Sequence, residues 1–221
     1  MGRTFREYDG IALKPEDLSE RVDFAQVFGR HGPVHVEIGS GKGTFLVREA
    51  KAHPYVDFLG IEWASKYYRH AVDRLGRWGL KNVRIIRADA SAFLRDRVPA
   101  GSVDCFHVYF PDPWPKKRHH KRRFVRNDNM QILIDRLKPG GTIQLATDHA
   151  DYFEQMRDVT SAFRGELEEV EFSRPAGAEP GEFAGTNYER KYIKDRRTIR
   201  VLAFRYAPSK RLNTVSATRL T

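Results

Sequence analysis

Short apolar runs alternate with amphipathic stretches along this chain from about residue 34 onward. The apolar runs are rich in β-branched residues and have the length of buried strands: VHVEI, VDFLGI, NVRII, VDCFHVYF, TIQLAT and TIRVLAFRY. Helical periodicity separates them, in residues 43–52, 64–75, 90–94, 127–136 and 148–163. Strands that alternate with helices in this way predict an α/β fold: a doubly wound, mostly parallel sheet with helices on both faces, as in Rossmann-like proteins.

The same pattern divides the chain into one domain with two appendages. A chain of 221 residues can bury one substantial core without dividing into several domains. We expect residues 34–206 to form this single domain and residues 1–33 to form an N-terminal extension with a short helix in DLSERVDFAQVFG. Within the domain, the Gly- and Pro-rich segment 173–185 is predicted to be a mobile loop, and residues 207–221 a basic, flexible tail.

Composition indicates where the protein is located and which metal sites it lacks. No run approaches the roughly 18 consecutive apolar residues of a membrane helix, and the start, MGRTFREYDG, lacks the apolar region of a secretory signal. We therefore expect a cytoplasmic protein with no membrane contact. The single cysteine, Cys105, excludes an internal disulfide and a cysteine-based metal site, and its apolar neighbours in VDCFHVYF predict a buried thiol.

Positive charge is concentrated in two segments. Residues 116–126 contain seven Lys or Arg and no acid, and residues 186–221 contain ten Lys or Arg and two acids. These segments carry +7 and +8, so the rest of the chain carries −5 of the overall +10. An acidic body with two basic segments favours a nucleic-acid partner, although charge runs are also common on solvated surfaces.

A glycine-rich turn follows the first strand of the predicted domain. In VHVEIGSGKGTF, Glu37 ends the strand, and three glycines follow it: Gly39, Gly41 and Gly43. A dinucleotide fingerprint would place its third glycine where Thr44 stands, and a phosphate-binding loop requires Gly-Lys-Ser/Thr, whereas the lysine here precedes a glycine. Glu37 would also repel a pyrophosphate. The turn therefore favours a ligand with a cationic or hydroxyl-rich edge, and a simple tight turn is the alternative.

Two further acids end the next two strands. Glu62 follows VDFLGI, about twenty residues beyond the glycines, where a carboxylate can accept hydrogen bonds from both hydroxyls of a ribose. Asp89 follows NVRII, where it can accept from an adenine amino group. Three acids at successive strand ends bracket a nucleoside with a positively charged extension, which describes S-adenosylmethionine. The alternative, helix N-caps and solvated acids, fits Asp89 best because Ser91 and Ala92 can open a helix.

The segment VYFPDPWPKKRHHKRRFV joins a rigid turn to a basic run at the end of the fourth strand. Phe110, Asp112 and Trp114 each precede a proline, so each is predicted to be extended and to lose little freedom when a substrate binds. Asp112 can accept hydrogen bonds from a guanine, and Trp114 can stack on a base. The candidates for phosphate contacts are Lys117, Arg118, Lys121, Arg122 and Arg123. The alternative is a structural turn followed by a solvated surface.

Six motifs, in their order and spacing, resemble the bacterial tRNA (guanine-N7)-methyltransferase family: EIGSGKG, GIEW, RADA, FPDPWPKKRHHKRR, ATDHADYF and GTNYERKY. The resemblance covers residues 34–206, and the fourth motif is highly specific. It implies a class I methyltransferase fold, S-adenosylmethionine as cofactor and methylation of a guanine in the variable loop of tRNA. No obligate protein partner is evident from the sequence.

The matching positions imply roles for individual residues. Those expected to bind the cofactor are Glu37, Gly39, Gly41, Gly43, Glu62, Asp89, Ala90 and Asp112, and Asp112 is also the expected catalytic residue. Those expected to contact the substrate are Lys116, Asp148, Thr186, Asn187, Tyr188 and Glu189. One position departs from the resemblance: the family usually has a glycine shortly after its TxYE motif, where this chain has Arg196.

The atom attacked determines the expected chemistry. Guanine N7 carries a lone pair in the ring plane and no proton, so no general base is required, and Asp112 is expected to orient the base and stabilise the positive charge that moves onto it. No metal is expected, because His119 and His120 are adjacent and do not readily converge on one ion; both fit RNA contacts better. Two alternatives stay open: a methyltransferase for another RNA site or a small molecule, and a non-catalytic RNA-binding module.

Overall fold

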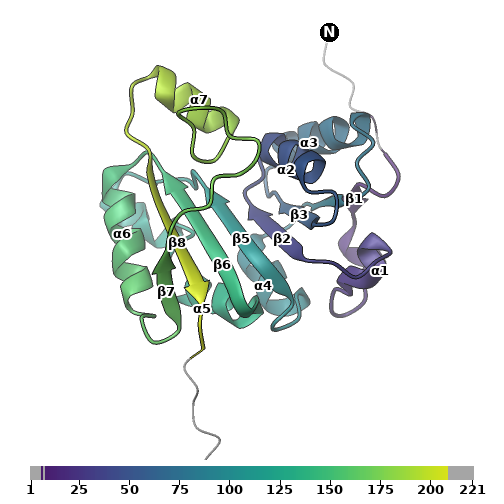
Figure 1. Ribbon diagram of the computed structural model, residues 1–221, viewed down its shortest axis with the longest axis horizontal. Helices are drawn as coiled ribbons and strands as arrows, with labels where there is room; N and C mark the ends of the chain where they lie inside the picture. The colour runs from purple at the N-terminus through teal and green to yellow at the C-terminus, as the bar shows by residue number, and fades with distance from the viewer. Residues whose placement is uncertain (1–5, 7, 209–221) are drawn as a thin grey trace, which may run out of the picture.

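The alternating pattern folds into one mixed sheet in the computed structural model, which describes residue 6 and residues 8–208 (Figure 1). Among these residues the strands are β1 (Ala12–Leu13), β2 (Val34–Ile38), β3 (Asp57–Ile61), β4 (Val83–Ile86), β5 (Val103–Tyr109), β6 (Leu137–Thr147), β7 (Leu167–Val170) and β8 (Arg200–Tyr206). The helices are α1 (Phe24–Phe28), α2 (Thr44–Ala52), α3 (Ser65–Arg77), α4 (Ala90–Arg97), α5 (Asn127–Arg136), α6 (Ala150–Ser161) and α7 (Asn187–Lys194), with the 3-10 helices η1 (Pro15–Asp17) and η2 (Lys117–Arg122). All the strands predicted from apolar runs are present.

The order of strands in the sheet is β1-β4-β3-β2-β5-β6-β8-β7. The pairs from β1 to β6 are parallel, and β8 runs antiparallel to both of its neighbours. The chain builds the sheet outward from β2, first through β3 and β4 on one side and then through β5 and β6 on the other. This reversal is a topological switch point, and the loops that leave the carboxyl ends of β2 and β5 separate there and form a crevice.

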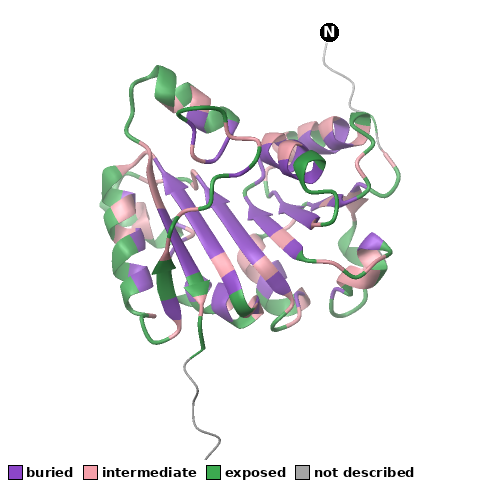
Figure 2. Ribbon diagram, viewed as in Figure 1, coloured by how far each residue is buried: buried purple, intermediate pink, exposed green. Residues whose placement is uncertain are grey.

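Helices cover both faces of the sheet and divide the apolar core in two. On one face, α4, α5 and α6 pack side chains such as Leu133 and Tyr152 against strand residues such as Val108. On the other face, α2 and α3 pack Phe45 and Leu75 against the opposite side of the same strands. Figure 2 shows that the central strands are buried along most of their length. The doubly wound, mostly parallel fold predicted from the sequence is therefore confirmed.

The N-terminal extension contributes to the sheet as well as a helix. Its helix α1 is shorter than DLSERVDFAQVFG suggested: Asp23 caps it by accepting a hydrogen bond from Gln26 N–H at 3.1 Å, and Gly29 ends it in the left-handed region. Before this helix, β1 pairs in parallel with β4. The sheet thus includes a strand from residues 1–33, and the domain boundary at residue 34 stays a prediction.

Other differences arise where polar residues hide regular structure. The predicted turn KPGG lies within β6, where the register with β5 passes from Val103↔Leu137 to Cys105↔Thr142 and the extra residues bulge out. Neither β7 nor α7 was predicted. The buried residue of α7 is Glu189, so this helix lacks the apolar periodicity of the others. Of the predicted tail, residues 209–221 lie outside the described part of the chain. No described helix is long and apolar enough to span a bilayer.

Candidate active site

The glycine turn after β2 forms the floor of the crevice. Gly39, Gly41 and Gly43 all have positive φ, the region that side chains rarely adopt. The N–H of Gly39 donates to the carbonyl of Ile61 at 2.8 Å, which ties the turn to the end of β3. A Cβ atom at Gly43 would lie 3.1 Å from Cβ of Ala71, so this glycine also allows α2 to approach α3. The glycine turn therefore allows a ligand to approach its backbone on one side and α3 to pack closely on the other.

Glu62, at the end of β3, is buried and held by the backbone. Its Oε2 accepts from Gly41 N–H at 2.8 Å, and its Oε1 accepts from Ala64 N–H at 2.7 Å. Burial raises the pKa of Glu62, and the nearby charge of Asp112 raises it further, while these backbone donors oppose the shift. Each oxygen still has a second lone pair. The carboxylate is therefore fixed in position with acceptor capacity left for a ligand.

Glu37 is the clearest sign that the crevice binds a cation. Its side chain is buried, and its Oε2 has no hydrogen-bond partner among the described residues. Burial raises the pKa of Glu37 from 4.5 to about 8, with a smaller contribution from the charge of Glu62. A buried polar atom without a partner is costly, and a bound positive charge would relieve that cost. Glu37 lines a cavity of about 200 Å³ beside the glycine turn.

Asp89 caps the N-terminus of α4, which was the alternative interpretation of this residue. It is exposed at the start of α4, and its Oδ1 accepts from Ala92 N–H at 2.9 Å. Ala90 is the first residue of that helix. The cap uses Oδ1, and no described residue donates to Oδ2. Asp89 thus lies at the end of β4, and its adenine contact stays a prediction.

The proline-rich loop after β5 is not extended as expected. Phe110 has a φ of 51° and Trp114 a φ of 42°, both in the left-handed region although each precedes a proline. Tertiary contacts account for the difference. The N–H of Phe110 donates to Ala146 O at 2.8 Å, and the Trp114 ring packs edge-on against His119 with its centroid 5.8 Å away. These contacts accompany a backbone conformation that the proline bias did not predict.

Asp112 and the cations that follow it are presented to solvent. Asp112 is exposed, and no described residue donates a hydrogen bond to it. Lys116 is exposed beside it, and the residues after Lys116 form the 3-10 helix η2, in which Lys117, Arg118, Lys121 and Arg122 are all exposed. The guanidinium carbon of Arg122 lies 4.9 Å from the Trp114 ring centroid. Four of the five predicted phosphate contacts are thus accessible.

Arg123 differs from the other members of the basic run and corrects the prediction for it. It is only 1% exposed. Its guanidinium donates to Pro113 O at 2.7 Å, to Gln155 at 2.8 Å and to the carboxylate of Asp151, and this last bond lowers the pKa of Asp151. Arg123 therefore clamps the proline loop onto α6. A buried arginine with its donors engaged cannot reach an RNA phosphate.

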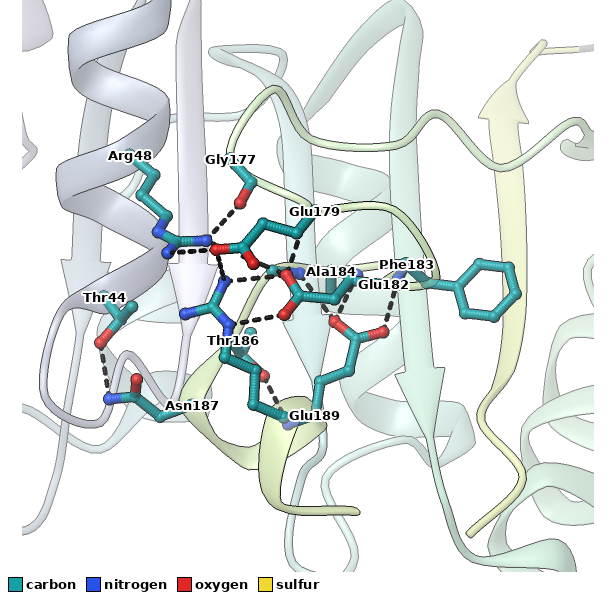
Figure 3. A network of polar contacts seen from close by, with 12 residues as sticks. Thr44, Arg48, Gly177, Glu179, Glu182, Phe183, Ala184, Thr186, Asn187 and Glu189 are labelled. Carbon is teal, nitrogen blue, oxygen red and sulfur yellow. Dashed lines mark hydrogen bonds and ion pairs between the residues drawn. The ribbon is translucent and has the colours of Figure 1, made fainter. Parts of the chain in front are cut away.

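The segment before α7 folds back onto α2, as Figure 3 shows. Thr186 caps α7 by accepting from Glu189 N–H at 3.1 Å. Glu189 is 0% exposed, and its carboxylate accepts from the N–H groups of Phe183, Ala184 and Gly185. We expected Glu189 to contact the substrate, but in this structure it organises the loop. The Thr-x-x-Glu spacing typical of a capping box could have indicated the start of α7, but the Glu189 carboxylate here accepts from the three residues before Thr186.

The first turn of α7 closes one side of the cavity that Glu37 lines. Thr186, Asn187 and Tyr188 line it together with the glycine turn, and their predicted contacts with the substrate stay a prediction. Tyr67 and Lys191 also line it and were not predicted. Tyr67 hydrogen-bonds to Tyr188, and burial first and this bond second raise the pKa of Tyr188 to about 12. Tyr67 lies on α3, so only the folded chain brings it to the cavity.

The end of α7 explains the unusual Arg196. This residue has a φ of 54°, a left-handed conformation in which glycine has no steric penalty. The next residue, Arg197, donates to Asp148 Oδ2 at 2.6 Å. Asp148 follows β6, so the ion pair joins the end of α7 to the mouth of the crevice. The backbone conformation thus matches the glycine that the family usually has there.

A second polar cluster lies further down the sheet. His35, Cys105 and His107 have ligand atoms within 4.8 Å of one another, which the count of one cysteine did not anticipate. Burial lowers the pKa of His35 to about 4 and raises that of the Cys105 thiol to about 12. The side chain of His107 hydrogen-bonds to Tyr109 at 2.8 Å and to His35 at 3.2 Å. The cluster is a neutral, internally bonded part of the core, with the buried thiol that was predicted.

The fold and the crevice define the class of the protein. Among solved structures, the 16S rRNA methyltransferase KamB has a TM-score of 0.59 at 17% identity, over 86% of this chain and 96% of that one. The aminoglycoside resistance methyltransferase NpmB1 has a TM-score of 0.56 at 18% identity, over 83% of this chain and 92% of that one. The chain has the class I methyltransferase fold, with carboxylates at the strand ends where such folds bind ligands.

Sequence relatives identify the family within this class. A family model described as "Putative methyltransferase" matches residues 31–202. The tRNA (guanine-N(7)-)-methyltransferase of Nitrosomonas eutropha is 39% identical over 183 residues, which cover 83% of this chain and 80% of that protein. The enzyme of the same name from Alkalilimnicola ehrlichii is 38% identical over 191 residues, 85% of this chain and 78% of its own. The chain belongs to the tRNA (guanine-N(7)-)-methyltransferase family.

Proposed function

We propose that this protein transfers a methyl group from S-adenosylmethionine to N7 of a guanine in the variable loop of tRNA. One observation carries the proposal: the buried, unpartnered carboxylate of Glu37 lies at the same switch point as the exposed carboxylate of Asp112 and its basic run. The first favours a cationic cofactor, and the second favours a nucleic acid. We also propose a cytoplasmic location; independence from a partner protein stays a prediction.

The residues of the crevice fit S-adenosylmethionine. Glu37 offers an unpartnered oxygen for a positive charge, and Glu62 offers a fixed carboxylate for ribose hydroxyls. The residues that would hold the cofactor are Glu37, Gly39, Gly41, Gly43, Glu62, Asp89, Ala90 and Asp112. When bound, S-adenosylmethionine supplies an electrophilic methyl group. Because guanine N7 needs no deprotonation, the protein's own contribution is to hold the methyl group and N7 in line for the transfer.

Asp112 is the residue that would act on the substrate. Its carboxylate has no protein donor, so it is available to accept hydrogen bonds from the N1–H and exocyclic amine of guanine. The same negative charge stabilises the positive charge that the base acquires on methylation. Lys116 and the exposed cations of η2 would hold neighbouring phosphates. Asp112 thus orients and stabilises, with no role as a general base.

The decisive experiment is the identification of the methylated nucleoside. The purified protein is incubated with S-adenosylmethionine and unmodified tRNA transcripts that carry either guanine or adenine at the variable-loop position, and digests are analysed by mass spectrometry. We expect N7-methylguanosine from the guanine transcript alone. Methylation elsewhere would support the first alternative, a different substrate. Absence of cofactor binding in calorimetry would support the second, a non-catalytic RNA-binding module.

A further inference from the structure

A second basic surface lies beside the cofactor cavity, on helices that follow β2 and β3. It is a groove of about 670 Å³ between α2, α3 and the first turn of α7. Its lining includes five cations: Arg48, Lys51, Arg74, Arg77 and Arg190. Among the described residues, no carboxylate lines it. None of these cations was a predicted phosphate contact, and the basic loop after β5 lies on the other side of the switch point.

Three of the five cations hold the walls of the groove. Arg190 pairs with Glu182 at 2.5 Å, and Arg48 pairs with Glu179 at 3.2 Å. Figure 3 shows Arg48 and Glu179 where the loop before α7 meets α2. Arg74 donates to Thr44 Oγ1 at 2.5 Å. These contacts fix the shape of the groove.

The other two cations are exposed and can turn to a ligand. Lys51 makes no ion pair with a described residue; its ammonium lies 3.9 Å from the ring centroid of Trp78. Arg77 is exposed; its Nη2 pairs with the buried carboxylate of Asp73 at 3.2 Å and its Nε donates to Asp73 O at 3.2 Å, which leaves its Nη1 donors for a ligand. Trp78 follows α3 and is 54% exposed. An exposed indole beside exposed cations is the combination with which proteins bind unpaired nucleotides.

We propose that this groove binds the ribose-phosphate backbone of the substrate RNA beyond the target nucleotide, with Lys51 and Arg77 on phosphates and Trp78 stacked on an unpaired base. The proposal rests on the proposed function, because it extends the substrate contact of that site. Thr44 and Asn187 line both the groove and the cofactor cavity, and Asn187 Nδ2 donates to Thr44 Oγ1 at 2.7 Å. RNA held by the β5 loop therefore meets a second basic surface across the cavity.

Charge decides between RNA and the chain's own C-terminal segment as the occupant. Residues 209–221 contain three Lys or Arg and no acid, so like charges disfavour their binding here. A polyanion with unpaired bases satisfies both the cations and the indole. The groove and the β5 loop would then hold the RNA from two sides of the cofactor cavity.

The test compares groove variants of the full chain with a matched control. Lys51→Gln/Arg77→Gln removes both available charges, and Arg157→Gln removes an exposed charge from α6, near the other edge of the sheet. The dissociation constant of an unmodified tRNA transcript is measured as a function of salt, and that of S-adenosylmethionine by calorimetry. We expect tRNA binding by the double variant to weaken roughly tenfold, with a salt slope lower by about one per residue, and the control and cofactor affinity to be unchanged.

Substitutions of Trp78 provide an independent test of the same proposal. Trp78→Ala should weaken tRNA binding about fivefold or more, and Trp78→Phe should restore most of it because stacking needs an aromatic face. Wild-type tRNA affinity in the double variant, while wild-type protein still forms N7-methylguanosine, would overturn the groove and leave the proposed function intact. A parallel loss of S-adenosylmethionine affinity would assign these residues to the cofactor site and also overturn the proposal. Wild-type protein that neither binds nor methylates tRNA would overturn the proposed function itself.

Discussion

The two halves of the crevice are held in place by opposite means. In the cofactor half, residues 37–43 and 62–64, the carboxylates are buried and the backbone donates to Glu62. In the substrate half, residues 110–126, the carboxylate of Asp112 is exposed and without a protein donor, and Arg123 clamps the loop from behind. The first half is fixed by the sheet itself, while the second is a surface loop held by side-chain and backbone contacts, among them the buried side chain of Arg123.

This difference has a chemical reason. A small cofactor can be enclosed, and acids buried near it stay poised for a cation because no water competes with it. A guanine in a large RNA must be met at the surface, so its carboxylate partner has to be accessible while its backbone stays still. Residues whose loss should affect cofactor binding are thus distinct from residues whose loss should affect turnover, and four predictions test that separation.

The largest effect is expected for Asp112→Asn. The substitution keeps the shape of the side chain but removes its charge and one acceptor, so single-turnover methylation of tRNA should fall by about 100-fold or more. Since no described residue bonds to Asp112, the unfolding temperature should not change. Cofactor binding should persist in weakened form, with a smaller loss than that of turnover, because Glu37 and Glu62 remain. Near-normal activity would show that the proline loop is only a scaffold. It would also contradict the division of the crevice into a cofactor half and a substrate half.

The substrate provides the control for Asp112. Inosine at the target position lacks the exocyclic amine, so the wild-type protein should methylate it more slowly than guanosine. In Asp112→Asn the two substrates should react at similar, low rates, because the acceptor that distinguishes them is impaired. Equal wild-type rates on both substrates would remove the proposed contact with the amine.

The accuracy of the sequence interpretation follows the same division. Apolar periodicity identified the strands β2 to β6 and β8 and most helices because burial sets their pattern, but it missed β1 and β7; the glycine turn and Glu62 then fell at strand ends by topology alone. The polar α7 was missed because its buried residue is Glu189. Tyr67 and the groove around Trp78 were missed because separate helices assemble them only in the folded chain.

The basic run shows a further limit. In KKRHHKRR the cations form one continuous run, and no periodicity within it predicts that Arg123 is buried and Arg122 exposed. In the structure the first is buried and the second exposed. The positive φ of Phe110 and Trp114 was likewise not predicted, because the contacts of Phe110 with Ala146 and of Trp114 with His119 form only in the folded chain.

The second prediction uses this adjacent pair. Arg123→Ala removes a buried side chain that donates hydrogen bonds to three acceptors. It should lower the free energy of unfolding by about 2–3 kcal/mol, measured by denaturant unfolding. Arg122→Ala, on the exposed neighbour, should change it by less than about 0.5 kcal/mol. Because Arg123 holds Pro113 O, tRNA methylation should fall more than cofactor affinity. Equal stability of the two variants would mean that the clamp does not hold the loop.

The third prediction concerns pH and the cofactor half. Burial raises the pKa of Glu37 from 4.5 to about 8, so within this window the folded protein keeps a proton that the unfolded chain has released. The free energy of unfolding should therefore decrease as pH rises through the window, by at most about 1.4 kcal/mol per pH unit. Glu37→Gln should remove this slope. Cofactor binding near pH 7 should release a proton, because a cation favours the ionised carboxylate.

Two buried histidines require a difference measurement here. His35 and His107 have lowered pKa values because burial disfavours their charged forms, so they add stability as pH rises toward 6.5, opposite in sign to Glu37. Subtracting the Glu37→Gln profile from the wild-type profile cancels their contribution. A flat difference, or no proton release in calorimetry with buffers of different ionisation enthalpy, would contradict a protonated Glu37.

The smallest effect is expected for single exposed cations of the basic loop. Lys117→Gln and Arg122→Gln should each lower the slope of log Kd for tRNA against log salt by about one, since each contact releases about one counterion. Neither substitution should alter cofactor affinity or the nucleotide that is methylated, because phosphate contacts position the RNA without choosing the base. Arg122 also lies 4.9 Å from the Trp114 ring centroid, so its variant should weaken binding slightly more than that of Lys117. Filter binding across a salt series with the α6 variant Arg157→Gln as control measures both slopes. Slopes that match the control for both residues would show that the run is only a solvated surface and that Asp112 acts without it.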